Sequence, residues 1–446
     1  MNKLLQKIAY AVMFFMTFGI SSAYAIPSFA RQTGLECTQC HTVFPELTET
    51  GRQFKLHGYT MTGGSSYKSP LDNLAAMVIL TDTKASAQVN DPSKTNIITP
   101  DQISLFYGGK IYENLGAFVQ VTYDGTGIVG GVKNGGTEKT NDVAHHFGTD
   151  NTDIRYVKDF KIQDHDIVIG ATLNNNPTVQ DIYNSTPAWG YPYWTTSAAS
   201  QSPANSTQVE GALGGIVRGL GVYTMIDDLL YLEATGYQSN RGGGLLSPLS
   251  YNDWYGQTAD VHGTSVYTRA ALQKTVGDHF FMLGGYTFNT EVVSDITANN
   301  QYNKFADRAI DAQYNYTNGS HIVTIMADKI WEKQTYLDGS SANPNDTLTT
   351  SKAKISYYYD QKYGVTAGIF STSGSADAKL YGTNSTLTPD ASGKMIELHY
   401  LPTQKVRISL AYTMFDKFNG AKDNYDGAGT NASKQDNLFL SAIIMF

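Results

Sequence analysis

Alternation of apolar and polar residues recurs in short segments from about residue 76 to the end of the chain. In the segment 352–360, KAKISYYYD, one side consists of Ala353, Ile355, Tyr357 and Tyr359. The segments 117–123, 395–401 and 406–414 alternate in the same way. Successive side chains of a β-strand point to opposite faces, so a period of two predicts strands with apolar surroundings on one side and polar surroundings on the other.

The connections between these segments alternate in length. Short turns are expected at 112–115, 226–228, 276–278, 317–319, 360–362 and 402–403. Long connections, rich in Gly, Asn, Ser and Thr, are expected at about 125–150, 175–212, 240–262, 290–303, 334–348, 375–392 and 416–435. Short turns on one side and long loops on the other are typical of outer-membrane barrels. We therefore predict an all-β transmembrane β-barrel of about 16 antiparallel strands, with a large secreted all-β protein as the alternative.

Composition and the final segment favour the barrel. The chain has 42 Gly, 30 Tyr and 19 Phe but only 16% charged residues, which suits half-exposed strands joined by tight turns. Its last residues, NLFLSAIIMF, alternate and end on Phe446, and such an aromatic end resembles the insertion signal of bacterial outer-membrane barrels. We find no nucleotide-binding loop, no hydrolase triad spacing and no basic tract for nucleic acid.

Residues 1–25 have the three parts of a secretory signal peptide. Lys3 and Lys7 precede an apolar run from Ile8 to Ile20, and Ala23-Tyr24-Ala25 forms a small-residue cleavage site. The alternative, a membrane-spanning helix, needs roughly 20 apolar residues, which is more than this run offers. We expect cleavage after Ala25 and export from the cytoplasm.

The two cysteines of the chain lie in the stretch LECTQCHTVF, residues 35–44. In an oxidising compartment a disulfide or a redox-active pair would be ordinary. No βαβ unit of the thioredoxin type flanks them, and Cys37-Thr38-Gln39-Cys40-His41 matches the c-type haem attachment motif. Cys37 and Cys40 are then the covalent thioether positions, and His41 is the proximal axial ligand of the iron. We predict a helical monohaem domain over 26–75 and the barrel over 76–446.

The distal haem ligand has two candidates by residue type. The stretch TETGRQFKLHGYTM predicts a short helix that ends near Gly58, with His57 close to its end and Met61 just beyond. Both residue types can bind haem iron, and Met raises the reduction potential. His57 as a solvated helix end, Met61 as a packing residue, and an open or externally supplied coordination position are the alternatives.

Residues 27–60, PSFARQTGLECTQCHTVFPELTETGRQFKLHGYT, closely resemble the N-terminal signature of the outer-membrane fused monohaem cytochrome–porin family. Residues 174–193 are similar to a loop of that family. The best-known members are extracellular Fe(II)-oxidising cytochromes of iron-oxidising bacteria, and homologues occur in bacteria that are not known to oxidise iron. The resemblance implies one covalent haem c and electron transfer at the outer membrane more strongly than it implies iron as the substrate.

These features together predict a haem domain that plugs the barrel lumen. A barrel of this size has room for more than its own side chains, and 50 residues are too few to bury a haem alone. Residues 26–75 carry four basic and four acidic side chains, so the net negative charge, about −10, lies on the barrel part 76–446 and would attract a small cation such as Fe²⁺. The alternative is that acidic outer loops merely keep the surface soluble. We expect oxidation of extracellular Fe(II), or of another reductant, and electron delivery to a periplasmic carrier such as a soluble cytochrome c. A diffusion channel with a structural or gating plug, and outward electron transfer, are the alternatives.

Two further groups are expected in the lumen. Glu397 and His399 alternate with apolar residues and so share the inferred lumenal face, where they would line the haem cavity. Tyr183, Trp189, Tyr191, Tyr193 and Trp194 lie in the longest loop, which would fold inward as a lid or constriction, the alternative being an interfacial aromatic belt.

Overall fold

The computed structural model describes residues 27–42, 46–63, 69–85, 97–124, 147–185, 205–211, 213, 216–239, 260–293 and 301–446. The predicted signal peptide, 1–25, lies outside them. The strands are β1 (Leu74–Ala85), β2 (Ile97–Tyr112), β3 (Leu115–Asp124), β4 (Phe147–Ile162), β5 (His165–Asn174), β6 (Val217–Ile226), β7 (Leu230–Ser239), β8 (Asp260–Val261), β9 (Thr264–Val276), β10 (His279–Val293), β11 (Asn303–Asn318), β12 (His321–Thr335), β13 (Asn345–Tyr359), β14 (Tyr363–Gly374), β15 (Ala391–Thr403), β16 (Val406–Lys417) and β17 (Asn437–Met445). The helices are α2 (Pro27–Thr33), α3 (Cys37–Cys40), α4 (Glu49–Leu56) and α5 (Gln208–Gly211), with 3₁₀ turns η1 (Pro70–Asn73) and η7 (Ala432–Gln435).

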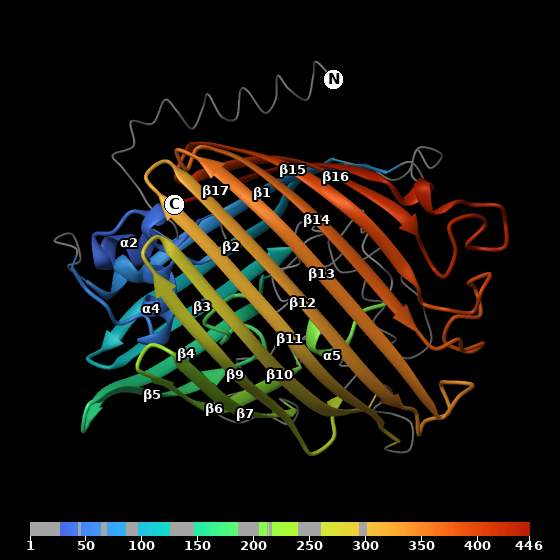
Figure 1. The fold of residues 1–446 in the computed structure, drawn as a ribbon, viewed down its shortest axis with the longest axis horizontal. Coiled ribbons are helices and arrows are strands. Elements are labelled where there is room, and N and C mark those ends of the chain that lie inside the picture. The colour runs from blue at the N-terminus through green and yellow to red at the C-terminus, as the bar shows by residue number, and fades with distance from the viewer. Residues whose placement is uncertain are drawn as a thin grey trace.

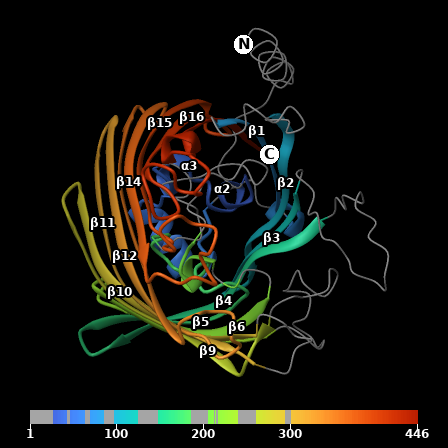
Figure 2. The ribbon, with the colours of Figure 1, turned by 90° about the vertical axis from the view of Figure 1, so that its right-hand side faces the viewer.

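The strands form one closed antiparallel barrel (Figures 1 and 2). Each strand pairs with the next along the chain, and β17 pairs with β1 to close the sheet. The short β8 and the longer β9 both pair with β10 and are two parts of one strand interrupted at His262 and Gly263. The described strands thus build a 16-stranded barrel, as predicted. The edge strands β1 and β17 form hydrogen bonds with each other, so no edge of the sheet is left unpaired among them.

The predicted faces of the strands are confirmed. On β13, Lys352, Lys354 and Ser356 are buried in the lumen, while the intervening Ile355 is exposed on the outer surface. Large apolar side chains are likewise exposed on other strands, among them Leu220, Leu283, Ile310 and Ile369. An outward apolar face on a closed antiparallel barrel with an even number of strands is that of a bacterial outer-membrane protein. None of the described helices is long and apolar enough to cross a membrane.

Tight turns join the strands at one end of the barrel, at the positions that the sequence predicted. Between β6 and β7, Asp227 and Asp228 have φ values of 53° and 50°, as the two central residues of a type I′ hairpin turn do. Asp360 and Gln361 have the same left-handed geometry between β13 and β14. Because these turns follow the right-handed twist of the strands, they fix which residue of each strand faces the lumen.

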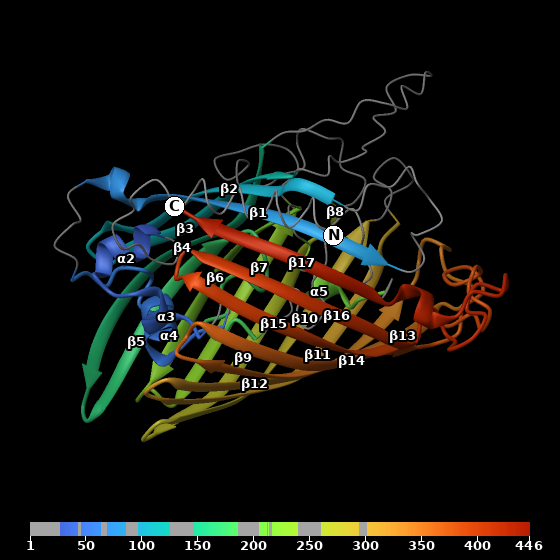
Figure 3. The same ribbon diagram turned by 90° about the horizontal axis from the view of Figure 1, so that it is seen from above.

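The helices α2, α3 and α4 lie at this short-turn end of the barrel, inside the ring of strands (Figures 2 and 3). We call the described residues 27–42 and 46–63 the plug. Gln53 of α4 donates a hydrogen bond to Asp228 of the β6–β7 turn at 2.6 Å. The backbone N–H of Cys37 donates to Gln404 of the β15–β16 turn at 3.2 Å. The strand part begins at Leu74, next to the predicted domain boundary at 75/76.

Residues 175–185, which follow β5, also lie in the lumen, and we call them the inner loop. Val179, Ile182 and Tyr183 are fully buried there, and Val179 packs with Phe54 of the plug. The predicted inward folding of the longest loop is therefore confirmed for this segment and for Tyr183. Trp189, Tyr191, Tyr193 and Trp194 lie outside the described residues.

Candidate functional site

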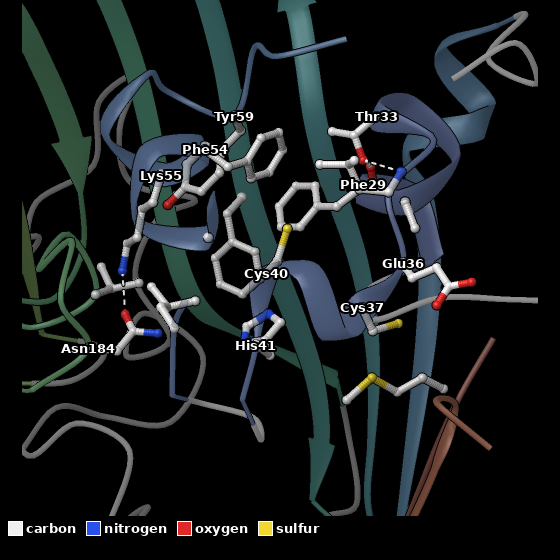
Figure 4. Close-up of a pocket in the computed structure, with 17 residues that line it drawn as sticks. Phe29, Thr33, Glu36, Cys37, Cys40, His41, Phe54, Lys55, Tyr59 and Asn184 are labelled. Carbon is white, nitrogen blue, oxygen red and sulfur yellow. Dashed lines mark hydrogen bonds between the residues drawn. The ribbon is translucent and has the colours of Figure 1, made fainter. Parts of the chain in front are cut away.

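A cavity of about 840 Å³, partly open to solvent, lies between the plug, the barrel wall and the inner loop (Figure 4). Its apolar lining comes mainly from Phe29, Leu35, Leu47, Phe54, Phe118 and Val179. The rings of Phe29 and Tyr59 are stacked with centroids 5.5 Å apart. A large, flat, apolar group would find matching aromatic surfaces here.

Cys37, Cys40 and His41 all line this cavity. Cys37 and Cys40 open and close the single helical turn α3, and the N–H of His41 donates to the carbonyl of Cys37 at 2.8 Å. One turn of helix between the two cysteines brings both thiols to the same cavity (Figure 4). The structure thus unites the three residues that the motif singled out.

The imidazole of His41 is held in one tautomer. Its Nδ1 lies 3.2 Å from the carbonyl oxygen of Glu46, and a carbonyl can only accept, so Nδ1 carries the proton. That tautomer leaves the lone pair on Nε2. Burial lowers the pKa of His41 to about 4, against a smaller raising effect of the Glu46 carbonyl, so the ring is neutral at physiological pH. Metal-binding histidines generally donate their second ring N–H in this way.

The structure holds Cys37 and Cys40 as thiols rather than as a disulfide. Burial raises the pKa of Cys37 to about 12 and that of Cys40 to about 11. Redox-active cysteine pairs have lowered thiol pKa values, because the thiolate is the reactive form. The surroundings of Cys37 and Cys40 are therefore unlike those of a redox-active dithiol.

Gly51 allows α4 to pack directly against α3. A Cβ at this position would collide with the carbonyl oxygen of Cys40 and press on Leu47. Thr48 caps α4 by accepting a hydrogen bond from the N–H of Gly51 at 3.2 Å, and its own N–H donates to the carbonyl of Cys40 at 3.0 Å. The absence of a side chain at Gly51 thus sets the distance between the cysteine turn and the helix that forms the opposite wall.

Buried polar contacts hold the plug to the barrel wall. The carboxylate of Glu46 pairs with Lys354 of β13 at 2.6 Å and accepts hydrogen bonds from Thr42 and Ser356. The guanidinium of Arg52 donates to Asn315 of β11 at 3.0 Å and lies over the ring of Phe280. The hydroxyl groups of Tyr59 and Tyr223 add contacts to Asp153 and to the Leu56 carbonyl, at 2.6 and 2.8 Å. The cavity therefore has rigid walls on several sides.

The two predicted distal ligands lie away from the cavity lining. His57 ends α4 with its Nδ1 2.9 Å from the Gln53 carbonyl and its Nε2 3.4 Å from Asp159 of β4. The side chain of Met61 is 37% exposed. Lys55, Tyr59 and Met445 line the cavity instead, and we did not single them out from the sequence. In the sequence, Lys55 follows Gly51 by four residues, and this spacing places the two residues on the same face of the predicted helix.

Lys55 joins the cavity to the inner loop (Figure 4). Its Nζ donates to the carbonyl of Asp181 and to Oδ1 of Asn184, each at 2.7 Å. The Asp181 carboxylate in turn accepts hydrogen bonds from the backbone N–H groups of Tyr183 and Ser185, which fixes the shape of the loop. Burial, with a contribution from the charge of Arg155, lowers the pKa of Lys55 to about 8.

A second cavity of about 520 Å³ adjoins the first and shares Cys37, His41 and Met445 with it. Lys405 and Arg407 line this second cavity and give it a positive rim. Glu397 and His399 face the lumen as predicted, and both contact Arg407, but neither lines either cavity. Among the described residues, no group of three or more His, Cys, Asp and Glu side chains could hold a metal ion.

No protein-family model matches the chain, and no curated protein is similar to it in sequence. Solved structures of outer-membrane proteins are similar in part. They include OmpT of Vibrio cholerae in its trimer form (12% identity, 84% of this chain and 98% of that chain, TM-score 0.43). They also include the outer-membrane channel DcaP of Acinetobacter baumannii (10% identity, 84% of this chain and 96% of that chain, TM-score 0.46). A third is OmpF of Salmonella typhi in complex with daunomycin (12% identity, 84% of this chain and 97% of that chain, TM-score 0.46).

Proposed function

We propose that this outer-membrane barrel is a cytochrome–porin that oxidises extracellular Fe(II) at a single c-type haem and passes the electrons to a periplasmic carrier. The observation that carries this proposal is the position of the CTQCH motif. Both cysteines and His41 line an apolar cavity within the barrel, at the end where the short turns lie. Short turns face the periplasm in barrels of this type, so the cavity lies at the end of the barrel that a periplasmic acceptor would approach.

The residues of the cavity fit a covalently bound haem. Cys37 and Cys40 would form the two thioether bonds, and His41 would bind the iron through Nε2, with Nδ1 fixed by the Glu46 carbonyl. Lys405, which lines the adjoining cavity, would pair with a haem carboxylate. When bound, the haem supplies reversible one-electron chemistry at the iron.

The barrel gives such a site access across the membrane. The apolar band of an outer-membrane barrel is about 25 Å tall, so a haem protein confined to the periplasm would be separated from a donor outside. A plug in the lumen shortens that separation. The inner loop, which follows β5, contacts Lys55 through Asp181 and Asn184 and forms part of the cavity wall.

The test is haem reduction from one side only. Proteoliposomes with Fe(II) added outside should show rapid reduction in reduced-minus-oxidised spectra. The double substitution of Cys37 and Cys40 by Ala should abolish this reduction, while its heat-modifiable mobility on a gel reports whether the barrel still folds. Absence of covalent haem in the wild-type protein, or no reduction by external Fe(II), would overturn the proposal.

A second candidate is a diffusion channel in which the plug is a structural or gating element. The closed barrel with its polar lumenal face favours it, since such a lumen can conduct solutes. In this case, liposomes should show solute flux that persists in the double cysteine variant. Outward electron transfer is distinguished in the same liposomes, because a periplasmic-side reductant would reduce the haem and an external acceptor would reoxidise it.

A further inference from the structure

We propose that Lys55 is the distal ligand of the haem iron, an inference that rests on the proposed function. It replaces the two candidates that residue type alone suggests, His57 and Met61. Lys55 belongs to α4, whereas the cysteines and His41 belong to α3 and its end, so the two elements reach the cavity from different sides (Figure 4).

The helix α4 turns only one face to the cavity. Gly51, Phe54 and Lys55 line it, and their spacing of three and four residues places them on the same helical face. His57 comes two residues later, about 200° around the helix axis at 3.6 residues per turn. Its Nε2 accordingly points to Asp159 of the barrel wall. The geometry of the helix thus directs Lys55, and not His57, to the cavity that the motif residues also line.

The contacts of Lys55 match those of a neutral amine that serves as a ligand. A neutral amine has two N–H donors and one lone pair. Two uncharged oxygens, the Asp181 carbonyl and Asn184 Oδ1, accept from Nζ, each at 2.7 Å. These two bonds hold the nitrogen in place, and the third N–H of the ammonium occupies the position that a metal would take. On binding, the third ammonium proton is released to solvent and the nitrogen lone pair forms the bond to iron.

The other two possible donors in the lining have different surroundings. The hydroxyl of Tyr59 is committed to Asp153 of the wall at 2.6 Å. Met445 lies where the two cavities meet, beside Cys37. Because Cys37 would attach to the edge of the porphyrin, we assign Met445 to that edge rather than to the iron.

Spectroscopy of the haem-loaded protein tests the assignment without any activity measurement. The wild type should show a low-spin ferric haem by electron paramagnetic resonance, with a near-infrared band of nitrogen rather than sulfur ligation. Lys55→Arg keeps the positive charge and the donors but cannot bind iron, since guanidinium does not lose its proton in proteins. We expect it to become high-spin. Lys55→Met should stay low-spin, with a sulfur-ligation band and a higher reduction potential.

The matched controls are His57→Ala and Met61→Ala, which should keep the wild-type spectrum. Asn184→Asp tests positioning, because a carboxylate at this place would hold Nζ as an ammonium and shift the protein toward high spin. A high-spin wild type, an unchanged low-spin spectrum in both Lys55 variants, or a low-spin signal lost in His57→Ala would overturn the inference. Covalent haem content and barrel mobility are measured for each variant. Missing haem in the wild type defeats the proposed function, whereas an unchanged spectrum in haem-loaded Lys55 variants defeats only this inference.

Discussion

The barrel wall and the plug are held together in different ways. In the wall, strands that are consecutive in sequence pair with each other, as β11 and β12 do from Lys304 with Thr335 to Asn318 with His321. The plug is held by contacts between residues far apart in sequence, such as Arg52 with Asn315 or Cys37 with Gln404. Backbone hydrogen bonds and a repeated side-chain pattern build the wall, whereas a few buried polar side chains position the plug. A single substitution in the wall should therefore remove only a small part of its stability, whereas the loss of one buried contact should release the plug.

The largest effect is expected from Lys354→Met. It removes the partner of Glu46 and leaves a buried carboxylate unpaired, which costs roughly 3–5 kcal/mol. We expect release of the plug, measured as protease cleavage of the N-terminal segment in denaturant series. Lys352→Met is the control, since Lys352 pairs with Glu210 of α5, which lies outside the plug. Equal protease sensitivity of both variants would contradict a specific role of Glu46.

The same ion pair predicts a pH dependence. Burial raises the pKa of Glu46, but the charge of Lys354 and several hydrogen bonds outweigh burial and lower it overall. The attachment is therefore complete above the ordinary glutamate pKa of about 4.3 and weakens as the pH falls through the lower folded pKa. Lys354→Met removes the charge and the hydrogen bond of Lys354, the largest effects that lower this pKa, and leaves only the hydrogen bonds from Thr42 and Ser356 against burial. We therefore expect acidification to weaken the attachment less in this variant than in the wild type. The measurement is protease protection of the plug in the wild type and in Lys354→Met, from neutral pH down to pH values below the pKa of free glutamate.

The second largest loss of stability is expected from a charge placed on the outer, apolar face of the wall. Ile310 of β11 is 54% exposed on the outer, apolar side. Ile310→Arg should destabilise the barrel in bilayers by roughly 2–4 kcal/mol if the residue lies near the midplane. The control is Ile310→Ala, which keeps the surface apolar. Folding yield into vesicles measures the difference, and equal yields would argue against a lipid-facing position.

Gly51→Ala should separate the two elements of the plug. The new Cβ collides with the Cys40 carbonyl, and overpacking of this kind costs roughly 1–3 kcal/mol. We expect less covalent haem and faster proteolysis of the plug, with the barrel unaffected. Gly211→Ala is the matched control, because no atom of the described residues lies within 4 Å of a Cβ there.

The smallest effect is expected for an ion pair on the surface of the wall. Lys161 and Asp166 lie 3.3 Å apart at the exposed β4–β5 turn. Exposed pairs contribute less than about 1 kcal/mol, because water and salt screen them. Lys161→Met should leave the unfolding midpoint nearly unchanged. A shift as large as that of Lys354→Met would mean that burial does not explain the difference between the two pairs.

The fold was predictable because its signals are local. Alternation in 352–360 and 406–414 gave the strand faces, and turn residues such as Asp227-Asp228 and Asp360-Gln361 gave the hairpins. The motif Cys37-Thr38-Gln39-Cys40-His41 was equally local, so its three residues were found together in the cavity. The other cavity residues were not predicted, since Met445 and Asn184 are far from the motif in sequence.

The sequence by itself determined the barrel, its lumenal face and the place of a haem motif before it, because each depends on residues within one strand, turn or helix. Only the tertiary structure decided which side chains share the cavity with His41. A helix face is directed by what it packs against. Gly51 lets α4 pack on α3, the inner loop accepts the hydrogen bonds of Lys55, and His57 faces Asp159 of the wall. The orientation of these side chains depends on contacts with residues that are far away in the sequence, and the spacing of residues along the chain does not reveal such contacts.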